Sequence, residues 1–432
     1  MATVRPNPPT GGVSFPREIV PAVIQQHVDD AAILHSTRTA LTQAPHVKLH
    51  HLRRFDDRLA AHLDGLAVAG EGAVGMCEAA LEVPNSSATF VATVRALEDR
   101  REDWLQRLVG LTESVPECGS GLRSAFGWLE REHLRGVVAG LLGSTDPKCR
   151  RVGIAASALH RVDPGLVAAC YLEDPDPAVR ARALRTAGEL GRRELVSAVV
   201  SSLLDTDEMC RFWAAWSAVL LGDRQNALEY LRAVALSDGP VQPRAFQLAL
   251  QAMPVSDAHE MLRRLTRDPA RLCMLIRGTG LVGDCTYISW LIGHMANDRL
   301  ARVAGEAFSM ITGADLPWLD LERKPPESIE AGPNDDANDP NVDMDADENL
   351  PWPDQRLVQE WWTQHGPGFD QNSRYFVGAL VTRGHCIDVL KNGYQRHRIA
   401  AAYHLGLSNP GTPLFEWRAP AWRQQRELAQ MT

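Results

Sequence analysis

Aspartate, proline and arginine recur in one short phrase along the middle of this 432-residue chain. Its fullest form is Asp174-Pro-Asp-Pro-Ala-Val-Arg180, in which an aspartate and an arginine four residues apart could form an ion pair or transfer a proton. The marker aspartates follow one another at 30 or 31 residues and are Asp146, Asp176, Asp207, Asp238, Asp268 and Asp298. Asp followed by Pro is also a common helix start. Because the period is so regular, we interpret the phrase as a helix start and an Arg/Asp ladder rather than as catalytic pairs.

Two other polar groups have residue types suited to catalysis. Asp56, Arg58, His62 and Asp64 lie within about two helical turns, and His46, His50 and His51 cluster near a loop. We interpret the first group as contacts of a terminal helix with neighbouring loops, and the second has no evident nucleophile beside it. The sequence contains no GxSxG, GxxxxGK[ST] or HExxH motif and no GxGxxG after a strand. We therefore predict no catalytic residue and no cofactor.

The eight cysteines include no CxxC pair, so they do not have the spacing of structural zinc ligands. We expect them to be small buried side chains in a reducing compartment, and we predict no metal site. Trp213 and Trp216 stand three residues apart beside Arg211, which leaves an exposed aromatic platform as an alternative to core packing. Core packing is the favoured interpretation, because aromatic residues at this spacing in a repeat helix usually face the interior.

A period of about thirty residues with helical patterning predicts an all-α fold, an α-solenoid of HEAT-like helical hairpins. Such repeats bury their apolar faces only against neighbours, so both ends need helical caps. A single long helical segment is expected over residues 86–113. The predicted divisions are a flexible arm (1–18), an N-terminal helical cap (19–83), degenerate repeats (84–143), regular repeats (144–323), an acidic flexible loop (324–353) and a C-terminal helical cap (354–432).

Most of the net charge of −9 comes from one segment. Between Pro325 and Gln355 there are ten acidic residues and no lysine or arginine, whereas the rest of the chain has 44 acidic and 45 basic residues. This composition is typical of a flexible loop. It is either a solvated linker or a surface that binds a basic region of a partner, as a mimic of polyphosphate. The candidate partner-binding residues are Asp335, Asp336, Asp339, Asp343, Asp345, Asp347 and Glu348.

A calcium loop is the third interpretation of the acidic segment. Asp343, Asp345 and Asp347 alternate as they do in such a loop. However, Glu348 stands where the loop requires glycine, and Asp354 stands where it requires glutamate. Calcium is therefore disfavoured.

Both ends of the chain resemble a known family. Residues 44–71, which begin Ala44-Pro-His-Val-Lys-Leu-His-His-Leu-Arg-Arg-Phe55, are similar to the N-terminal signature of a proteobacterial family of HEAT-like repeat proteins. Tyr394-Gln-Arg-His-Arg-Ile-Ala-Ala-Ala402 and Pro413-Leu-Phe-Glu-Trp-Arg-Ala-Pro-Ala-Trp-Arg-Gln-Gln-Arg-Glu-Leu428 resemble its closing signature. Members of that family are often encoded beside type VI secretion effector genes. The resemblance implies a secretion effector or toxin domain as partner, and it implies no catalytic residue.

Together these observations predict a non-enzymatic protein-binding solenoid, and the resemblance implies an immunity protein that neutralises a cognate type VI effector. The alternatives are an adaptor or chaperone that loads an effector for secretion, and a lyase-type HEAT-repeat enzyme. We expect a cytoplasmic protein that is monomeric when free, because the N-terminus has no apolar signal region and no run of eighteen apolar residues exists. Nucleic acid is disfavoured as a partner, since the chain is acidic and has no basic stripe.

Overall fold

Aspartate side chains cap the first helix of four repeat units, as the sequence predicts. Their carboxylates accept backbone N–H groups of the first turn: Asp146 from Lys148, Asp176 from Ala178 and Val179, Asp207 from Cys210, and Asp268 from Ala270. The prediction is wrong for the other two units. Asn297 caps the last helix instead of Asp298. Val241 rather than Asp238 stands at the N-cap of the helix that begins at Gln242, and Asp238 accepts a hydrogen bond from Arg271 at 3.0 Å.

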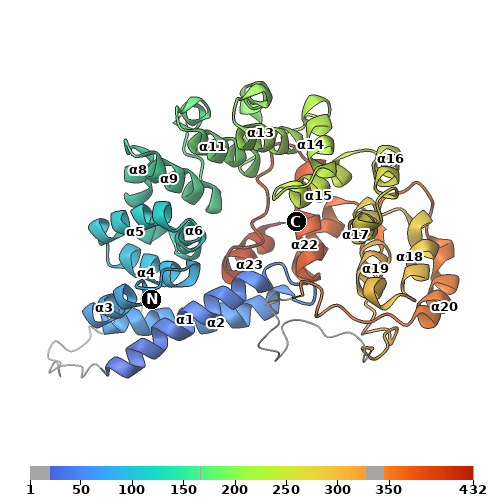
Figure 1. Cartoon of the computed structure of the whole chain (residues 1–432), viewed down its shortest axis with the longest axis horizontal. Coiled ribbons are helices and arrows are strands. Elements are labelled where there is room, and N and C mark those ends of the chain that lie inside the picture. The colour runs from blue at the N-terminus through green and yellow to red at the C-terminus, as the bar shows by residue number, and fades with distance from the viewer. Residues whose placement is uncertain (1–19, 166, 327–344, 432) are drawn as a thin grey trace, which may run out of the picture.

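The computed structural model describes residues 20–165, 167–326 and 345–431, and its helices form an all-α solenoid, which confirms the predicted fold class (Figure 1). The inner row is α4 (Ser86–Glu98), α6 (Cys118–Trp128), α9 (Pro147–Leu159), α11 (Pro177–Glu189), α13 (Glu208–Leu220), α15 (Gln242–Ala252), α17 (Leu272–Val282) and α19 (Asp298–Thr312). The outer row is α5 (Glu102–Ser114), α8 (Val137–Leu142), α10 (Val167–Cys170), α12 (Val196–Ser201), α14 (Asn226–Leu236), α16 (Val255–Leu265) and α18 (Ile288–His294).

The remaining elements lie before, between and after these two rows. They are α1 (Pro21–Leu41), α2 (Leu49–Ala69), α3 (Glu71–Ala80), α7 (Arg131–Leu134), α20 (Gln355–His365), α21 (Arg383–Asn392), α22 (Gln395–Ser408) and α23 (Ala421–Gln430). Short 3-10 helices are η1 (Tyr171–Glu173), η2 (Arg193–Leu195), η3 (Ser202–Leu204), η4 (Pro269–Arg271), η5 (Cys285–Tyr287) and η6 (Gly366–Gly368). A small antiparallel hairpin is formed by β1 (Tyr375–Phe376) and β2 (Ala379–Leu380). The predicted arm, residues 1–18, lies outside the described residues.

The arginines of the repeated phrase connect one repeat to the next. Arg150 donates from Nε and Nη2 to the carboxylate of Asp174 at 2.8 and 2.9 Å, and Arg180 pairs with Asp205 in the same way at 2.9 and 3.0 Å. The predicted Arg/Asp ladder is thus confirmed at Arg150 and Arg180, whereas Arg211 donates to the backbone carbonyls of Asp205 and Thr206 in its own phrase at 2.8 and 2.9 Å. The expected pairing within one phrase is wrong, because Arg150 and Arg180 each reach the aspartate that starts the next phrase, 24 or 25 residues on.

We expect the replacement Asp205→Asn to lower the free energy of unfolding by about 1–3 kcal/mol, because it weakens the bidentate acceptor of a partly buried guanidinium. Urea unfolding of the variant measures this loss, with Glu173→Gln, an exposed acid nearby, as control. In a double-mutant cycle with Arg180→Gln the coupling should be about 1 kcal/mol. A coupling near zero would mean that this rung does not stabilise the stack.

The helix expected over residues 86–113 is interrupted at Arg100. Arg100 adopts a left-handed conformation with φ of 53°, and the Arg101 N–H donates to the carbonyl of Ala96 at 2.8 Å. These are the features of a Schellman helix end, which most often uses glycine at this position. The sequence prediction missed the break because arginine carries no signal for it. The turn separates α4 from α5, so residues 84–143 contain the same alternation of inner and outer helices as the regular repeats.

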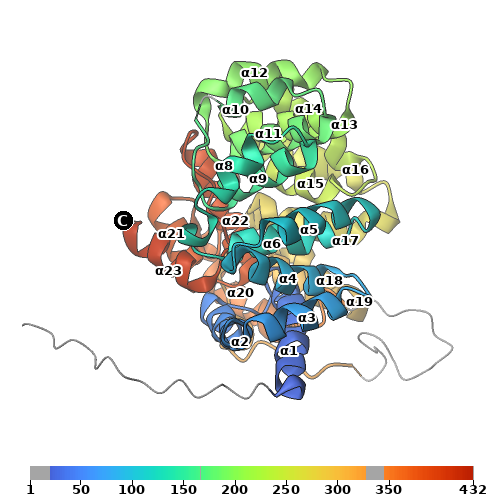
Figure 2. The same cartoon turned by 90° about the vertical axis from the view of Figure 1, so that its left-hand side faces the viewer.

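The C-terminal segment returns along the edge of the solenoid where the inner helices end (Figure 2). The N–H of Tyr375 donates to the carbonyl of Gly283 at 2.8 Å, and that of Leu414 donates to the carbonyl of Glu189 at 2.9 Å. Gly283 ends α17 with φ of 77°, and a Cβ there would lie 2.1 Å from the Tyr375 carbonyl oxygen, so only glycine fits. Only α20 packs on the last outer helix, α18, as the expected C-terminal cap would. The residues after α20 run back along the stack toward the earlier repeats.

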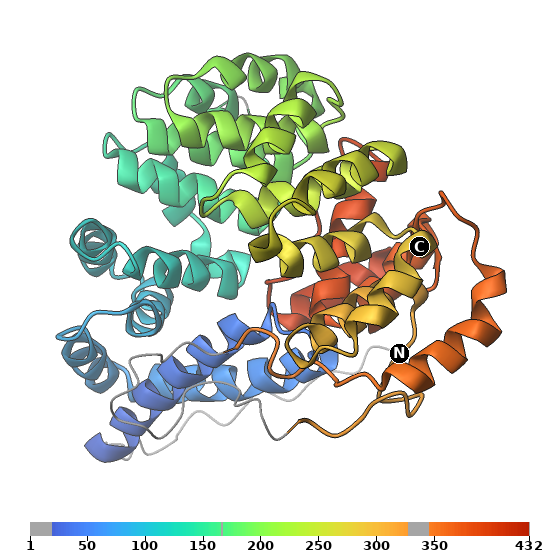
Figure 3. The same ribbon diagram turned by 45° about the vertical axis from the view of Figure 1, so that its right-hand side comes forward.

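This returning segment closes the arc against the N-terminal hairpin of α1 and α2 (Figure 3). The N–H of Gln395 donates to the carbonyl of Val47 at 2.8 Å, and α23 packs on α2. The buried carboxylate of Asp56 accepts the N–H of Ala421 at 2.5 Å and an ion pair from Arg38. The two stretches that carry the family resemblance therefore contact each other, although they are more than 300 residues apart in sequence.

Trp213, Trp216 and most cysteines lie in the core. Trp213 and Trp216 are only 7% and 2% exposed, which confirms core packing and excludes the exposed platform. Six cysteines are buried as predicted, and burial raises the pKa of the Cys77 and Cys210 thiols to about 12. Cys170 and Cys273 are exposed, so the prediction fails for those two. Within the described ranges, no helix is long and apolar enough to cross a membrane.

Candidate functional site: a cavity beside the acidic turn

The last part of the acidic segment forms a turn, residues 345–349, that continues the ladder. Asp345 accepts a hydrogen bond from Arg302 Nη2 at 2.6 Å, and its Oδ1 accepts the N–H of Asp347 at 2.9 Å. Asp174 and Asp205 make the same two contacts in the repeats, each to an arginine of the preceding inner helix and to the N–H two residues on. The acidic turn thus occupies the place of an inter-repeat turn behind α19.

The prediction of a flexible loop over 324–353 is wrong for residues 345–353, and residues 327–344 lie outside the described residues. Residues 345–353 have defined contacts, including the N–H of Arg323, which donates to the carbonyl of Trp352 at 2.7 Å. The correction has a sequence signal, because Asp345-Ala-Asp347 has the Asp-x-Asp pattern of Asp174-Pro-Asp176. Burial alone would raise the pKa of Asp345, but hydrogen bonds from the Asp347 N–H and Arg302 outweigh it and lower the pKa.

Asp347 is at the centre of a charge cluster that joins three parts of the chain. Its carboxylate accepts a hydrogen bond from Arg396 Nη1 of α22 at 2.9 Å and pairs with Arg277 of α17. Arg396 also pairs with Glu306 of α19 at 2.8 Å and donates to the carbonyl of Ala346 at 2.7 Å. Burial alone would lower the pKa of Arg396, but the carboxylates of Glu306 and Asp347 outweigh it and raise the pKa. Two of these groups, Arg277 and Glu306, were not singled out from the sequence, and Arg396 was noted only as part of a locally basic C-terminal end.

This cluster forms one wall of a cavity of about 830 Å³. The other walls come from the turn between α1 and α2, from α15, and from the inner sides of α17 and α19. Most of the lining is apolar, with Leu41, Phe246, Met274, Met310 and Ile399 among its residues. Its volume is within the range of about 300–1,000 Å³ that is usual for binding pockets. The cavity exists only because the chain returns on itself.

The predicted partner-binding residues have different surroundings. Asp345 and Asp347 are paired with arginines of the same chain, whereas Glu348 is exposed and lines the cavity. Asp335, Asp336, Asp339 and Asp343 lie outside the described residues. Of the three clustered histidines, only His46 is among the residues that line the cavity. Burial lowers the pKa of His46, although the negative charge of Glu348 acts to raise it. Its Nδ1 is buried and has no hydrogen-bond partner within the described part of the chain.

The polar group of α2, which consists of Asp56, Arg58, His62 and Asp64, does not assemble into a site. The Asp56 carboxylate points toward Ala421, where the C-terminal segment meets α2, and we call this contact the ring closure. Arg58 and Asp64 are exposed. His62 contacts His27, with 3.1 Å between their Nδ1 atoms. Asp56 thus bonds a neighbouring segment, as we interpreted, but over a much longer sequence distance than expected.

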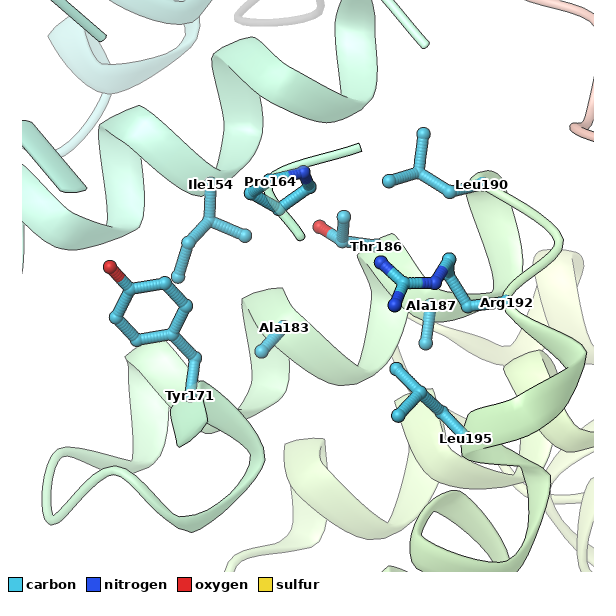
Figure 4. A pocket seen from close by; sticks show the side chains of 9 residues that line it. All are labelled: Ile154, Pro164, Tyr171, Ala183, Thr186, Ala187, Leu190, Arg192 and Leu195. Atoms are coloured by element: carbon cyan, nitrogen blue, oxygen red, sulfur yellow. The ribbon is translucent and has the colours of Figure 1, made fainter. Parts of the chain in front are cut away.

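A second cavity, between α9 and α11, is too small for a ligand (Figure 4). Its volume is about 10 Å³, roughly the space of a single water molecule. Ile154, Tyr171 and Leu195 are among its mostly apolar lining residues. Among residues 20–165, 167–326 and 345–431, no group of three or more His, Cys, Asp or Glu side chains is arranged to hold a metal ion.

Comparison with known protein families identifies HEAT repeats at residues 164–253, the stretch from before η1 to the end of α15. A comparison with curated proteins finds none that matches the sequence. HEAT repeats commonly serve as scaffolds for protein interactions. The matched stretch, the stacked hairpins on both sides of it and the all-α topology make this chain a HEAT-like repeat protein.

Proposed function

We propose that this solenoid is a non-enzymatic binding protein that holds a protein partner at the cavity and the acidic segment beside it. The observation that carries the proposal is the position of Glu348, an exposed carboxylate that lines a mostly apolar cavity of about 830 Å³. A cavity of this size accommodates a few side chains of a partner but not a folded domain. The partner would therefore insert a short apolar anchor.

The negative charge of the acidic segment supports the same location for the partner. Asp335, Asp336, Asp339 and Asp343 precede the acidic turn in sequence, and no lysine or arginine lies between Pro325 and Gln355. A partner with a basic rim around its apolar anchor would be attracted to these carboxylates. Such complementarity accelerates association and disfavours acidic competitors. In this proposal Asp345 and Asp347 fix the turn, and Glu348 and the four earlier aspartates contact the partner.

The resemblance of residues 44–71 and 394–428 suggests which partner this is. The family it indicates is often encoded beside type VI secretion genes, so we propose that the partner is a secretion effector or toxin domain and that the chain neutralises it in the cytoplasm as an immunity protein. An adaptor or chaperone for the same effector would use the same surface. Co-expression with the toxic domain distinguishes the two roles, because an immunity protein restores growth and an adaptor is required only for export.

The test begins with capture of the partner from the source strain and its identification by mass spectrometry. We then expect the fourfold variant Asp335→Asn, Asp336→Asn, Asp339→Asn and Asp343→Asn to slow association at low salt by about tenfold. The matched control replaces four exposed glutamates elsewhere, Glu82, Glu117, Glu132 and Glu229, by glutamine. Surface plasmon resonance at several salt concentrations measures both sets.

Equal association rates and equal salt dependence in the two fourfold variants would show that the acidic segment is not part of the interface. A purified protein that carries a chromophore would instead favour the lyase alternative.

A further inference from the structure

Five arginines of the inner row lie near enough to influence one another, and we name them the arginine surface. They are Arg123 of α6, Arg151 of α9, Arg182 and Arg185 of α11, and Arg244 of α15. Figure 1 shows these four helices along the inner side of the arc. Arg185 and Arg244 flank the ring of Trp213, with their guanidinium carbons 4.6 and 5.2 Å from its centroid. Trp213 of α13 therefore joins the arginines on either side into one surface.

Few carboxylates balance this charge. Glu189 pairs with both Arg182 and Arg185 and is the acid that these two arginines share. Within the described ranges, Arg123, Arg151 and Arg244 have no ion pair and donate no side-chain hydrogen bond. Five guanidinium groups thus lie near two carboxylates, Glu189 and Glu416, and Glu416 also pairs with Arg161, in a chain whose net charge is −9.

The arginines are close enough to influence one another. Burial, together with the positive charges of Arg151, Arg182 and Arg185, lowers the pKa of Arg123 to about 10. Arg123 is nevertheless exposed to solvent, so a ligand can reach its guanidinium group. Like charges gathered in a partly desolvated region create a positive potential that attracts anions.

The chain itself shows which anion this chemistry suits. At three places an arginine of an inner helix holds an Asp-x-Asp turn: Arg150 with Asp174, Arg180 with Asp205, and Arg302 with Asp345. Guanidinium groups bind carboxylates with two parallel hydrogen bonds, as Arg150 and Arg180 do here. The spare arginines of the arginine surface offer the same donors without an internal carboxylate for each.

We propose that the arginine surface binds an acidic, aspartate-rich segment of a protein partner. Nucleic acid is the less favoured occupant, because the overall negative charge of the chain repels a long polyanion. A short acidic peptide is influenced mainly by the positive potential next to the arginine surface. The surface differs from the cavity and the acidic segment, so the inference does not depend on the proposed function.

Fluorescence anisotropy tests the proposal with a labelled twelve-residue peptide of alternating aspartate and serine. We expect Arg123→Gln with Arg244→Gln to weaken peptide binding about tenfold. The control, Arg263→Gln with Arg356→Gln, makes the same charge change at exposed arginines of α16 and α20 and should stay close to wild type. Arg123→Lys with Arg244→Lys keeps the charge but loses the planar donors, so its affinity should fall between the two.

Several outcomes would overturn the proposal. They are an absence of peptide binding to the wild-type chain, an equal loss in the control variant, and tighter binding of a twelve-nucleotide single strand than of the peptide. Circular dichroism checks that the variants fold, and the single variant Arg123→Gln, at an exposed side chain, keeps the test valid if Arg244→Gln disturbs the packing around Trp213.

Discussion

Replacing Asp56 by alanine is expected to lower the free energy of unfolding by about 3–5 kcal/mol, because it leaves a buried guanidinium without its carboxylate. Asp56 has no exposed surface, and its partner Arg38 is 7% exposed. The same carboxylate accepts the N–H of Ala421 at the start of α23. The variant therefore removes an ion pair and a hydrogen bond at once.

The location of Asp56 makes this loss larger than that of a surface ion pair. Arg38 also donates to the carbonyls of Arg418 and Ala419 at 3.1 and 2.9 Å, so its orientation determines how the C-terminal segment meets the N-terminal hairpin. Without Asp56 the charge of Arg38 is uncompensated, and the segment before α23 loses its anchor. We expect the ring closure to open before the repeats unfold, which protection of the Ala421 amide in hydrogen exchange would report.

Asp57→Ala is the matched control, because Asp57 is exposed and makes only an i,i+4 pair with Arg53 at 2.8 Å. Its expected cost is about 0.5 kcal/mol or less. The double variant Arg38→Met with Asp56→Leu removes both charges and should recover a large part of the loss. If Asp56→Ala is no more destabilising than Asp57→Ala in urea unfolding, the ring closure does not depend on this pair.

The repeat architecture was predictable because each unit carries its own local signals. Asp146, Asp176 and Asp207 cap the helices that follow them, and the alternation of apolar residues places the core. Sequence patterns of this kind report on contacts within about thirty residues. They fail where local chemistry departs from preference, as at Arg100, whose left-handed turn ends α4 without a glycine.

The candidate site was not predictable in the same way. Its walls join Leu41, Phe246, Met310 and Ile399, which no local period connects. The acidic turn is an intermediate case. Its Asp345-Ala-Asp347 pattern matches the repeat turns, but the acidic composition around it concealed the match. Contacts between the ends of the chain depend on the curvature of the stack, which is the sum of many small rotations between repeats.

Acidification from pH 7 to pH 5.5 is expected to cost this protein about 4–5 kcal/mol of folding stability through four buried histidines. Burial lowers the pKa of His35 and His404 to about 3, and that of His160 and His397 to about 4, from an ordinary value of 6.5. Arg38 adds to the shift at His35, and Arg374 adds to it at His404. Each of these imidazoles is neutral in the folded protein at pH 5.5.

The direction of the effect follows from where the protons bind. Below pH 6.5 the unfolded chain takes up a proton at each of these histidines, whereas the folded chain does not do so until pH 3 to 4. Stability is therefore fully present above pH 6.5 and is lost as the pH falls, by about 1.4 kcal/mol per pH unit for each histidine. Glu98 and Glu427 act in the opposite direction, because burial raises their pKa and protonation stabilises their folded form.

Urea unfolding at pH 7.0, 6.0 and 5.5 measures the loss, and the variant His404→Gln isolates one contributor. His404 is buried against Phe376, with 5.0 Å between ring centroids, so the variant is destabilised at every pH. Its loss between pH 7.0 and 5.5 should nevertheless be smaller than that of wild type by about 1 kcal/mol, since one titrating group is absent. Cys386→Ala is the control, because burial raises the pKa of that thiol to about 11 and its replacement destabilises the core equally at each pH. A pH dependence that is unchanged by His404→Gln would show that the folded protein protonates His404 as readily as the unfolded chain does.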